Sequence, residues 1–301
     1  MNKNDNEWTG TVLSNENIAT FIKELVVEIS DGKQIHYLPG SYVLFHIPPF
    51  CTHTDKWKET IHPQYLSHWI GSQMLGQEID LSSLPPTDCA FSIASYPAEG
   101  NILKFNVRIV PPPFVNGELA KNIPWGIGSS YIFSLRNGDT VHFSGPYGDA
   151  LMIDDDRELV FLIGGAGASF ARSHLLHLFR TKKTKRKVTM WYGARSLKDN
   201  VYGDELNLLM KDFPNFEYHL VISEPHKDDI QAGWPTNDPV KSNLLYLAFE
   251  QGQLKHMESP QNSLFYVCGP PLLNKSVLQI LKDYGVSREN IILDDFNPTG
   301  K

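Results

Sequence analysis

The sequence is poor in cysteine and lacks any long apolar run. It has three cysteines in 301 residues, Cys51, Cys89 and Cys268. They are too scattered for a disulfide framework and too few to supply the four thiolates of an ordinary iron–sulfur cluster. No stretch approaches the roughly 18 consecutive apolar residues that a membrane span needs, and the polar N-terminus MNKNDNEW is no signal peptide. We therefore expect a soluble protein of a reducing compartment.

An excess of positive charge is also absent. The chain has 27 Lys and Arg against 34 Asp and Glu, a formal charge of −7, which argues against a nucleic-acid partner. The one basic run, RTKKTKRK at 180–187, is typical of a solvated loop. Histidines are not spaced with cysteines or carboxylates as metal ligands would be, so we expect no metal.

The first half of the chain has the pattern of β-strands. Runs at 20–29, 42–47 and 102–110 alternate or are continuously apolar, are rich in β-branched and aromatic residues, and are separated by turn residues. They predict an antiparallel barrel or sandwich.

Three other segments interrupt the strands of this half. Segments 48–88 and 111–125 are too long for simple turns, and we expect both to be surface insertions. A short helix is expected at 129–135, after Gly126-Ile127-Gly128. Its serines suit either an anion at the helix start or simple capping.

After Asp154-Asp155-Asp156 the pattern changes to alternating strands and helices. Strands are expected at 159–163, 188–192, 217–222, 264–268 and 291–293, and helices at 171–179, 204–210, 241–250 and 272–284. This order predicts a parallel sheet covered by helices on both faces, with its ligand at the carboxyl ends of the strands. We place the boundary between the two predicted domains, 1–152 and 153–301, at this change of pattern.

The first of these strands runs into a glycine turn, Gly164-Gly165-Ala166-Gly167. A strand, glycine turn and helix present backbone amides and a helix N-terminus to an anion such as a pyrophosphate. The dinucleotide fingerprint Gly-x-Gly-x-x-Gly is incomplete because Phe170 takes its third position, so a tight connection without a ligand is the alternative. Further turns at the strand ends, Gly193-Ala194-Arg195-Ser196, Cys268-Gly269-Pro270-Pro271 and Asp294-Asp295-Phe296, favour a nucleotide site.

An ordered set of short motifs runs through both halves. It consists of Phe91-Ser92, Gly128-Ser129-Ser130, Gly145-Pro146-Tyr147-Gly148, the glycine turn and Cys268-Gly269-Pro270-Pro271. With this order, the chain resembles the ferredoxin-NADP reductase superfamily, which implies an antiparallel FAD-binding β-barrel followed by a Rossmann-like α/β domain that binds NADH.

Longer stretches resemble one family within it, the F subunits of the sodium-translocating NADH:quinone reductases. They are ASYPAEGN (94–101), NVRI (106–109), SSYIFSL (129–135), WYGARS (191–196), YVCGPP (266–271) and ILDDF (292–296). The resemblance runs from about Trp8 to Phe296. It does not include the membrane helix and [2Fe-2S] ferredoxin domain with which that subunit normally starts, so we expect its flavin and NADH half alone.

The resemblance implies a flavoprotein NADH dehydrogenase. Hydride would pass from NADH to FAD, and single electrons from there toward a [2Fe-2S] ferredoxin domain, as the electron input of a sodium-pumping complex that reduces ubiquinone. The implied partners are that ferredoxin domain and the membrane subunits, at the cytoplasmic side of the bacterial inner membrane. The alternatives are a soluble ferredoxin or oxygenase reductase and a degenerate binding domain without flavin.

The resemblance also implies roles for individual residues. Ser92, Cys268 and Phe296 would act at the reacting rings: Ser92 near flavin N5, Cys268 beside the nicotinamide, and Phe296 as a movable cover on the flavin. The implied FAD-binding residues are Phe91, Ser92, Asn106, Val107, Arg108, Ile109, Gly128, Ser129 and Ser130. The implied NADH-binding residues are Gly165, Ala166, Gly167, Ala194, Arg195, Ser196, Cys268, Gly269, Pro270 and Pro271.

Several residues depart from the family pattern. Cys89 replaces the usual Arg that pairs with the FAD pyrophosphate, which predicts weaker FAD binding unless Arg108 or Lys104 compensates. Phe91 lacks the usual Tyr hydroxyl. Ile163, Ser169 and Phe170 replace Gly, Ala and Pro, and we expect Phe170 to narrow the NADH site.

The coenzyme itself is only partly determined by the residues. Arg195 is at a place where an arginine can mark a 2′-phosphate, as in NADPH. The same Gly-Ala-Arg-Ser occurs in the NADH-using family, and we follow that resemblance in predicting NADH.

Overall fold

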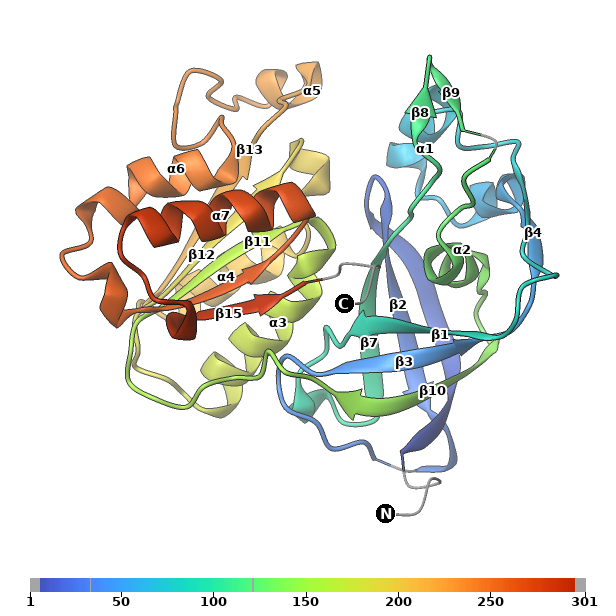
Figure 1. Cartoon of the computed structure of the whole chain (residues 1–301), viewed down its shortest axis with the longest axis horizontal. Helices are drawn as coiled ribbons and strands as arrows, with labels where there is room; N and C mark the ends of the chain where they lie inside the picture. The colour runs from blue at the N-terminus through green and yellow to red at the C-terminus, as the bar shows by residue number, and fades with distance from the viewer. Residues whose placement is uncertain (1–5, 33, 121, 296–301) are drawn as a thin grey trace. The chain divides into compact units, whose positions relative to one another are not determined.

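The computed structural model describes residues 6–32, 34–120 and 122–295 (Figure 1). The chain divides into two compact units, Met1–Gly148 and Asp149–Lys301. Within the described residues, no helix is long and apolar enough to cross a membrane. The predicted helix at 129–135 exists as α2 (Ile127–Ser134).

The first unit is built on one six-stranded antiparallel sheet in the order β6-β3-β10-β1-β2-β7. Phe45 of β3 lies fully buried in its core, where its ring centroid is 5.1 Å from that of Phe105 and 5.3 Å from that of Phe143. The strands are β1 (Glu7–Ala19), β2 (Ile22–Ile29), β3 (Tyr42–Ile47), β6 (Thr87–Ser92), β7 (Ile102–Arg108) and β10 (Thr140–Tyr147).

Segment 48–88 is not the surface insertion that we expected. It forms β4 (Cys51–His53), a 3-10 helix (Thr54–Glu59), α1 (Pro63–Gly71) and β5 (Glu78–Asp80). Trp57 and Trp69 are fully buried, and their ring centroids lie 5.4 and 5.8 Å from that of Phe133 in α2. The segment therefore extends the core of the first unit instead of lying on its surface.

The described residues of segment 111–125 are mostly exposed or half-buried. It carries a two-stranded hairpin, β8 (Phe114–Val115) with β9 (Glu118–Leu119), whose Phe114 and Val115 side chains are exposed. Two of its described residues are buried, Pro112 and Trp125, and the Trp125 ring lies 5.9 Å from that of Trp57 between centroids.

The second unit is a five-stranded parallel sheet in the order β13-β12-β11-β14-β15. Its strands are β11 (Leu159–Gly164), β12 (Val188–Ala194), β13 (Phe216–Ile222), β14 (Leu264–Cys268) and β15 (Ile291–Asp294). The pattern of an antiparallel sheet followed by a parallel α/β unit confirms the predicted fold class.

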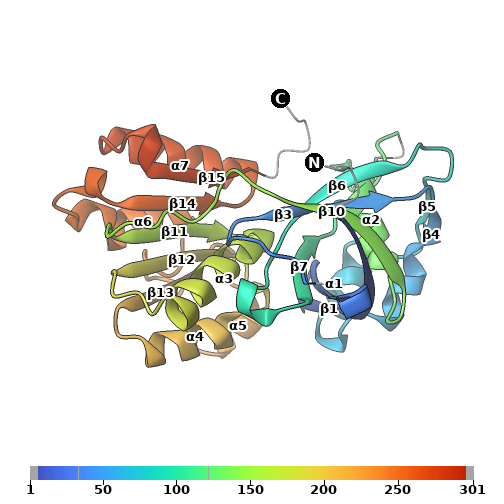
Figure 2. The ribbon, with the colours of Figure 1, turned by 90° about the horizontal axis from the view of Figure 1, so that it is seen from below.

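Helices cover both faces of this parallel sheet (Figures 1 and 2). Helices α6 (Leu245–Gly252) and α7 (Pro271–Asp283) pack on one face, where Phe249 and Val277 are fully buried. Helices α3 (Ala168–Leu176) and α4 (Gly203–Asp212) lie on the other. The helix expected at 241–250 begins later, at Leu245. The residues before it are held in a turn, because the Asp238 carbonyl accepts from the N–H groups of Lys241 and Ser242.

Candidate functional site

In the first unit, the start of α2 packs against the end of β6. A Cβ atom built on Gly128 would lie 2.9 Å from Cys89 Cβ and 3.0 Å from Phe91 Cζ. Glycine is therefore required at this position unless both neighbours shift. The Phe91 ring also meets Phe45 edge-on, with 5.5 Å between centroids. The structure thus brings together Cys89, Phe91 and Gly128, which are up to 39 positions apart in the sequence.

The same helix start is bonded to the end of β7. Ser129 Oγ accepts a hydrogen bond from the Val110 N–H at 3.1 Å and donates one to the Gly126 carbonyl at 3.1 Å. Ser130 is fully buried, and its Oγ has no hydrogen-bond partner among the described residues. A buried hydroxyl without a partner costs free energy, and an anionic oxygen at the helix N-terminus would supply one.

The other residues predicted to bind FAD lie at the ends of the same strands. Ser92 is buried at the end of β6, and Asn106 and Val107 are buried in β7. Ile109, just beyond β7, is buried as well, whereas Arg108 is exposed.

Lys104 is the other cation that could replace the missing arginine at the FAD pyrophosphate. Its Nζ lies 4.0 Å from a carboxylate oxygen of Glu24 and 3.9 Å from one of Glu99. Its charge is already offset by these carboxylates.

In the second unit, the glycine turn has the predicted strand–turn–helix form. Gly165 adopts a left-handed backbone conformation with φ of 55°, which glycine adopts without steric cost. Residues Gly165–Gly167 make one 3-10 turn that leads directly into α3. Tyr192, which the sequence analysis did not select, donates from its hydroxyl to the Gly165 carbonyl at 3.1 Å. A buried tyrosine hydroxyl at a strand end needs such an acceptor, and this need could have indicated Tyr192 as a partner of the turn.

The turn packs directly on the end of β14. A Cβ atom on Gly167 would overlap the carbonyl oxygen of Cys268 and lie 2.9 Å from its Sγ. A Cβ atom on Gly269 would lie 3.3 Å from the Gly164 nitrogen. The turns after β11 and β14 therefore meet backbone to backbone, as the sequence analysis expected from the parallel order of the strands.

Cys268 is fully buried at this edge, and its Sγ lies 3.8 Å from Asp294 Oδ2 at the end of β15. Burial is the main cause that raises the pKa of the Cys268 thiol well above its usual range, and the nearby carboxylates of Asp294 and Asp295 add to it. The thiol is therefore protonated at neutral pH. Asp294, which was not among the predicted catalytic residues, acts here as its acceptor.

The remaining predicted residues surround this edge, with one exception. Ala194 and Ser196 are buried after β12, Arg195 is exposed, and Pro270 and Pro271 are exposed at the start of α7. The prediction for Phe296 lies outside the described residues.

Phe170 does not take the position that we expected for it. Its side chain is fully buried, 4.4 Å from His174 and 6.0 Å from Tyr266 between ring centroids. The expectation that Phe170 narrows the NADH site is therefore wrong, because its ring fills the core between α3 and the sheet.

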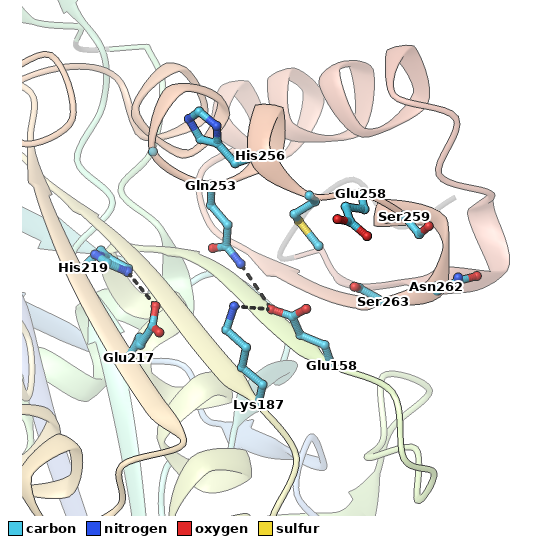
Figure 3. A pocket seen from close by; sticks show the side chains of 12 residues that line it. Glu158, Lys187, Glu217, His219, Gln253, His256, Glu258, Ser259, Asn262 and Ser263 are labelled. Atoms are coloured by element: carbon cyan, nitrogen blue, oxygen red, sulfur yellow. Dashed lines mark hydrogen bonds and ion pairs between the residues drawn. The ribbon is translucent and has the colours of Figure 1, made fainter.

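A cavity of about 570 Å³ lies at the opposite edge of the parallel sheet, where the strands begin (Figure 3). Lys187 Nζ lies 3.2 Å from Glu158 Oε1, and His219 Nε2 lies 3.6 Å from Glu217 Oε2. Glu158 thus offsets the charge of Lys187, and the cavity is remote from the glycine turn. Across the described residues, no group of three or more His, Cys, Asp and Glu side chains is arranged to hold a metal ion.

Comparison with known proteins gives close sequence relatives. Residues 161–279 match the family described as oxidoreductase NAD-binding domain. The chain is 53% identical over 295 residues to the F subunit of the Na(+)-translocating NADH-quinone reductase of Chlamydia pneumoniae, covering 97% of this chain and 68% of that protein. It is 40% identical over 291 residues to the F subunit of the same enzyme from Methylococcus capsulatus, covering 96% and 68%.

Solved structures share the fold at low identity. The FAD/NAD-binding domain of nitric oxide dioxygenase from Vibrio cholerae has a TM-score of 0.67 at 19% identity, covering 96% of this chain and 98% of that one. Ferredoxin-NADP+ reductase from Plasmodium falciparum has a TM-score of 0.63 at 17% identity, covering 96% and 95%.

Proposed function

Since this chain belongs to the family of the F subunits of Na(+)-translocating NADH-quinone reductases, we propose that it is the part of such a subunit that oxidises NADH with FAD. The observation that carries the proposal is a close approach at one helix start in each unit. At Gly128 of α2 and at Gly167 before α3, a Cβ atom would meet the neighbouring strand end. We assign FAD to residues 1–152 and NADH to residues 153–301.

The residues of the first unit fit FAD. The amides at the start of α2 and the buried Ser130 hydroxyl would hold the pyrophosphate, and Gly128 lets this helix start lie close to Cys89 and Phe91. Phe91 would pack against the flavin ring, with Ser92 near its reactive nitrogen and the backbone of residues 106–109 along its edge. FAD, when bound, allows the two electrons of a hydride to leave one at a time.

The residues of the second unit would position NADH. Gly165, Ala166 and Gly167 present backbone amides to its pyrophosphate, and Cys268 lies where two strand ends meet. A protonated thiol is a poor nucleophile. Because burial and Asp294 raise its pKa, Cys268 can lie beside the positively charged product ring without attacking it.

We base the proposed path of the electrons beyond FAD on the family to which the chain belongs. We propose that single electrons leave toward a [2Fe-2S] ferredoxin domain of the full-length protein, which works within a sodium-translocating, quinone-reducing membrane complex, on its cytoplasmic side. What supports this is the name and the identity of the relatives.

The test is reduction of the flavin by NADH. We expect purified protein to take up FAD, to lose its visible flavin absorption when NADH is added without oxygen, and to reduce ferricyanide, a one-electron acceptor, in turnover. A colourless protein that binds no added FAD would contradict the proposal.

Replacing Cys89 by Arg is expected to tighten FAD binding by roughly 10-fold to 100-fold, the value of one charge-assisted hydrogen bond of about 1.5–3 kcal/mol. The side chain of residue 89 passes directly over Gly128, at the start of α2. An arginine here would therefore extend toward the pyrophosphate, where the neutral thiol offers no charge. Burial raises the pKa of the Cys89 thiol above its ordinary value, which favours this neutral form.

Fluorescence titration of the apoprotein with FAD measures the effect. The matched control is Cys51→Arg, which adds the same charge at an exposed cysteine in β4. Equal affinities of Cys89→Arg and the unchanged protein would refute the charge argument.

A further inference from the structure

Two cations follow β12, at the edge where the adenosine part of the coenzyme would lie. Arg195 is exposed directly after the strand, and Lys198 is in the 3-10 turn Leu197–Asp199. An arginine or lysine in this place ordinarily favours the 2′-phosphate of NADPH. From the cations alone, this edge would accept either coenzyme.

The turn after β13 lies against these cations. The Glu224 N–H donates to the Arg195 carbonyl at 3.0 Å, which joins the two turns. Asp229 is 2% exposed and accepts from the Leu197 N–H at 3.2 Å. Its other carboxylate oxygen accepts from the His226 N–H at 2.8 Å. The buried Asp229 carboxylate thus fixes the second turn against the first.

This arrangement pairs Lys198 with a carboxylate. Asp228 Oδ2 lies 3.0 Å from Lys198 Nζ. The two backbone turns that carry this pair are held together by the buried bonds of Asp229, while the Asp228 side chain itself is 69% exposed.

The charges of the two turns together are net negative. Setting His226 aside, they consist of three cations, Arg195, Lys198 and Lys227, and four carboxylates, Asp199, Glu224, Asp228 and Asp229. A 2′-phosphate brings a further charge of about −1.5 to −2. It would meet net repulsion and a lysine that is already paired, whereas a ribose 2′-hydroxyl brings no charge.

We infer that Asp228 makes this edge select NADH against NADPH by neutralising Lys198 and repelling a 2′-phosphate. The inference rests on the proposed function, because it assigns the adenosine end of NADH to this edge. The Asp228 carboxylate acts on the choice of coenzyme and takes no part in hydride transfer.

The experiment compares 5′-AMP with adenosine 2′,5′-bisphosphate by calorimetry, together with kcat/KM for NADH and NADPH. The unchanged protein should prefer 5′-AMP and NADH. Asp228→Asn should shift both preferences toward the 2′-phosphate by about fivefold. This ratio corresponds to roughly 1 kcal/mol of electrostatic free energy between screened charges. The double variant Asp228→Asn with Lys198→Met should lose that shift, since the released lysine is its cause.

Asp212→Asn is the matched control, because it removes the same charge at the far end of α4 and should leave the ratio unchanged. An unchanged ratio in Asp228→Asn, a shift that persists without Lys198, or a failure of both nucleotides to bind would overturn the inference. If the nucleotide ratio shifts as expected but NADH does not reduce the flavin, the proposed function fails while the selection at this edge stands.

Discussion

Replacing Gly167 by alanine is expected to lower kcat/KM for NADH by at least about a hundredfold. The added Cβ would overlap the carbonyl oxygen of Cys268 and lie 2.9 Å from both its carbonyl carbon and its Sγ. Two of these three atoms are backbone, so the start of α3 and the end of β14 must separate. A displacement of about 1 Å at a reacting site can cost a factor of 10². Steady-state reduction of ferricyanide by NADH measures the loss.

Two further variants separate this effect from a general effect of alanine. Gly164→Ala places its Cβ 3.2 Å from Leu273 Cδ1 and 3.3 Å from Pro270 Cδ, which are side-chain atoms, and should cost less than about tenfold. Gly71→Ala, with nothing within 4 Å, should cost no activity. FAD content and thermal melting show whether Gly167→Ala is folded. A folded Gly167→Ala protein with nearly unchanged kcat/KM would show that this close approach is not needed.

The strands of both units follow from local sequence. Strands β3 and β14 occupy the predicted positions, because alternation in 42–47 and a continuous apolar run in 264–268 are decided by residues within each strand. The parallel order then places the turns after the strands at one edge, so most residues of the proposed NADH site could be grouped without knowledge of contacts. The α6 boundary could not, because the Asp238 carbonyl accepts from the N–H groups of Lys241 and Ser242 and so holds the preceding residues in a turn instead of a helix.

What the sequence analysis missed are pairings between distant segments. The tryptophans, histidines and prolines of 48–88 suggested a surface insertion, although Trp57, Ile61, Tyr65 and Trp69 recur every four residues, the spacing of a buried helical face. All four are buried in the core of the first unit. Likewise, Phe170 was judged from its place in a motif, whereas its direction is set by packing against His174 and Tyr266.

The buried side of segment 48–88 also packs against a lysine of β2 whose burial costs free energy. Lys23 of β2 is fully buried; its Nζ donates to Thr60 Oγ1 at 2.7 Å and lies 5.1 Å from the centroid of the Phe133 ring. Loss of solvation is the main cause that lowers the pKa of Lys23 from 10.5 to about 7; the charge of Arg136 lowers it further and that of Glu16 opposes the change. The charged form of this amine is therefore disfavoured by folding.

The sign of the pH dependence follows from these two pKa values. Between pH 7 and pH 10.5 the unfolded chain binds a proton at Lys23 that the folded chain does not. The free energy of unfolding therefore rises with pH across this window, by at most about 1.4 kcal/mol per pH unit from this group. The cost is present in full below pH 7 and disappears above pH 10.5.

Replacing Lys23 by methionine is therefore expected to raise the free energy of unfolding at pH 7 by on the order of 3 kcal/mol. It should also remove the increase of this free energy with pH between pH 7 and pH 10.5. Thr60 is not left without partners, because its Oγ1 still donates to the Trp57 carbonyl and accepts from Arg136 Nη1. Urea unfolding followed across the pH window measures both effects, with the exposed Lys56→Met in the same segment as the control. If Lys23→Met instead destabilises the protein at pH 7, the bond to Thr60 and the contact with Phe133 outweigh the lost solvation, and the amine holds segment 48–88 in place.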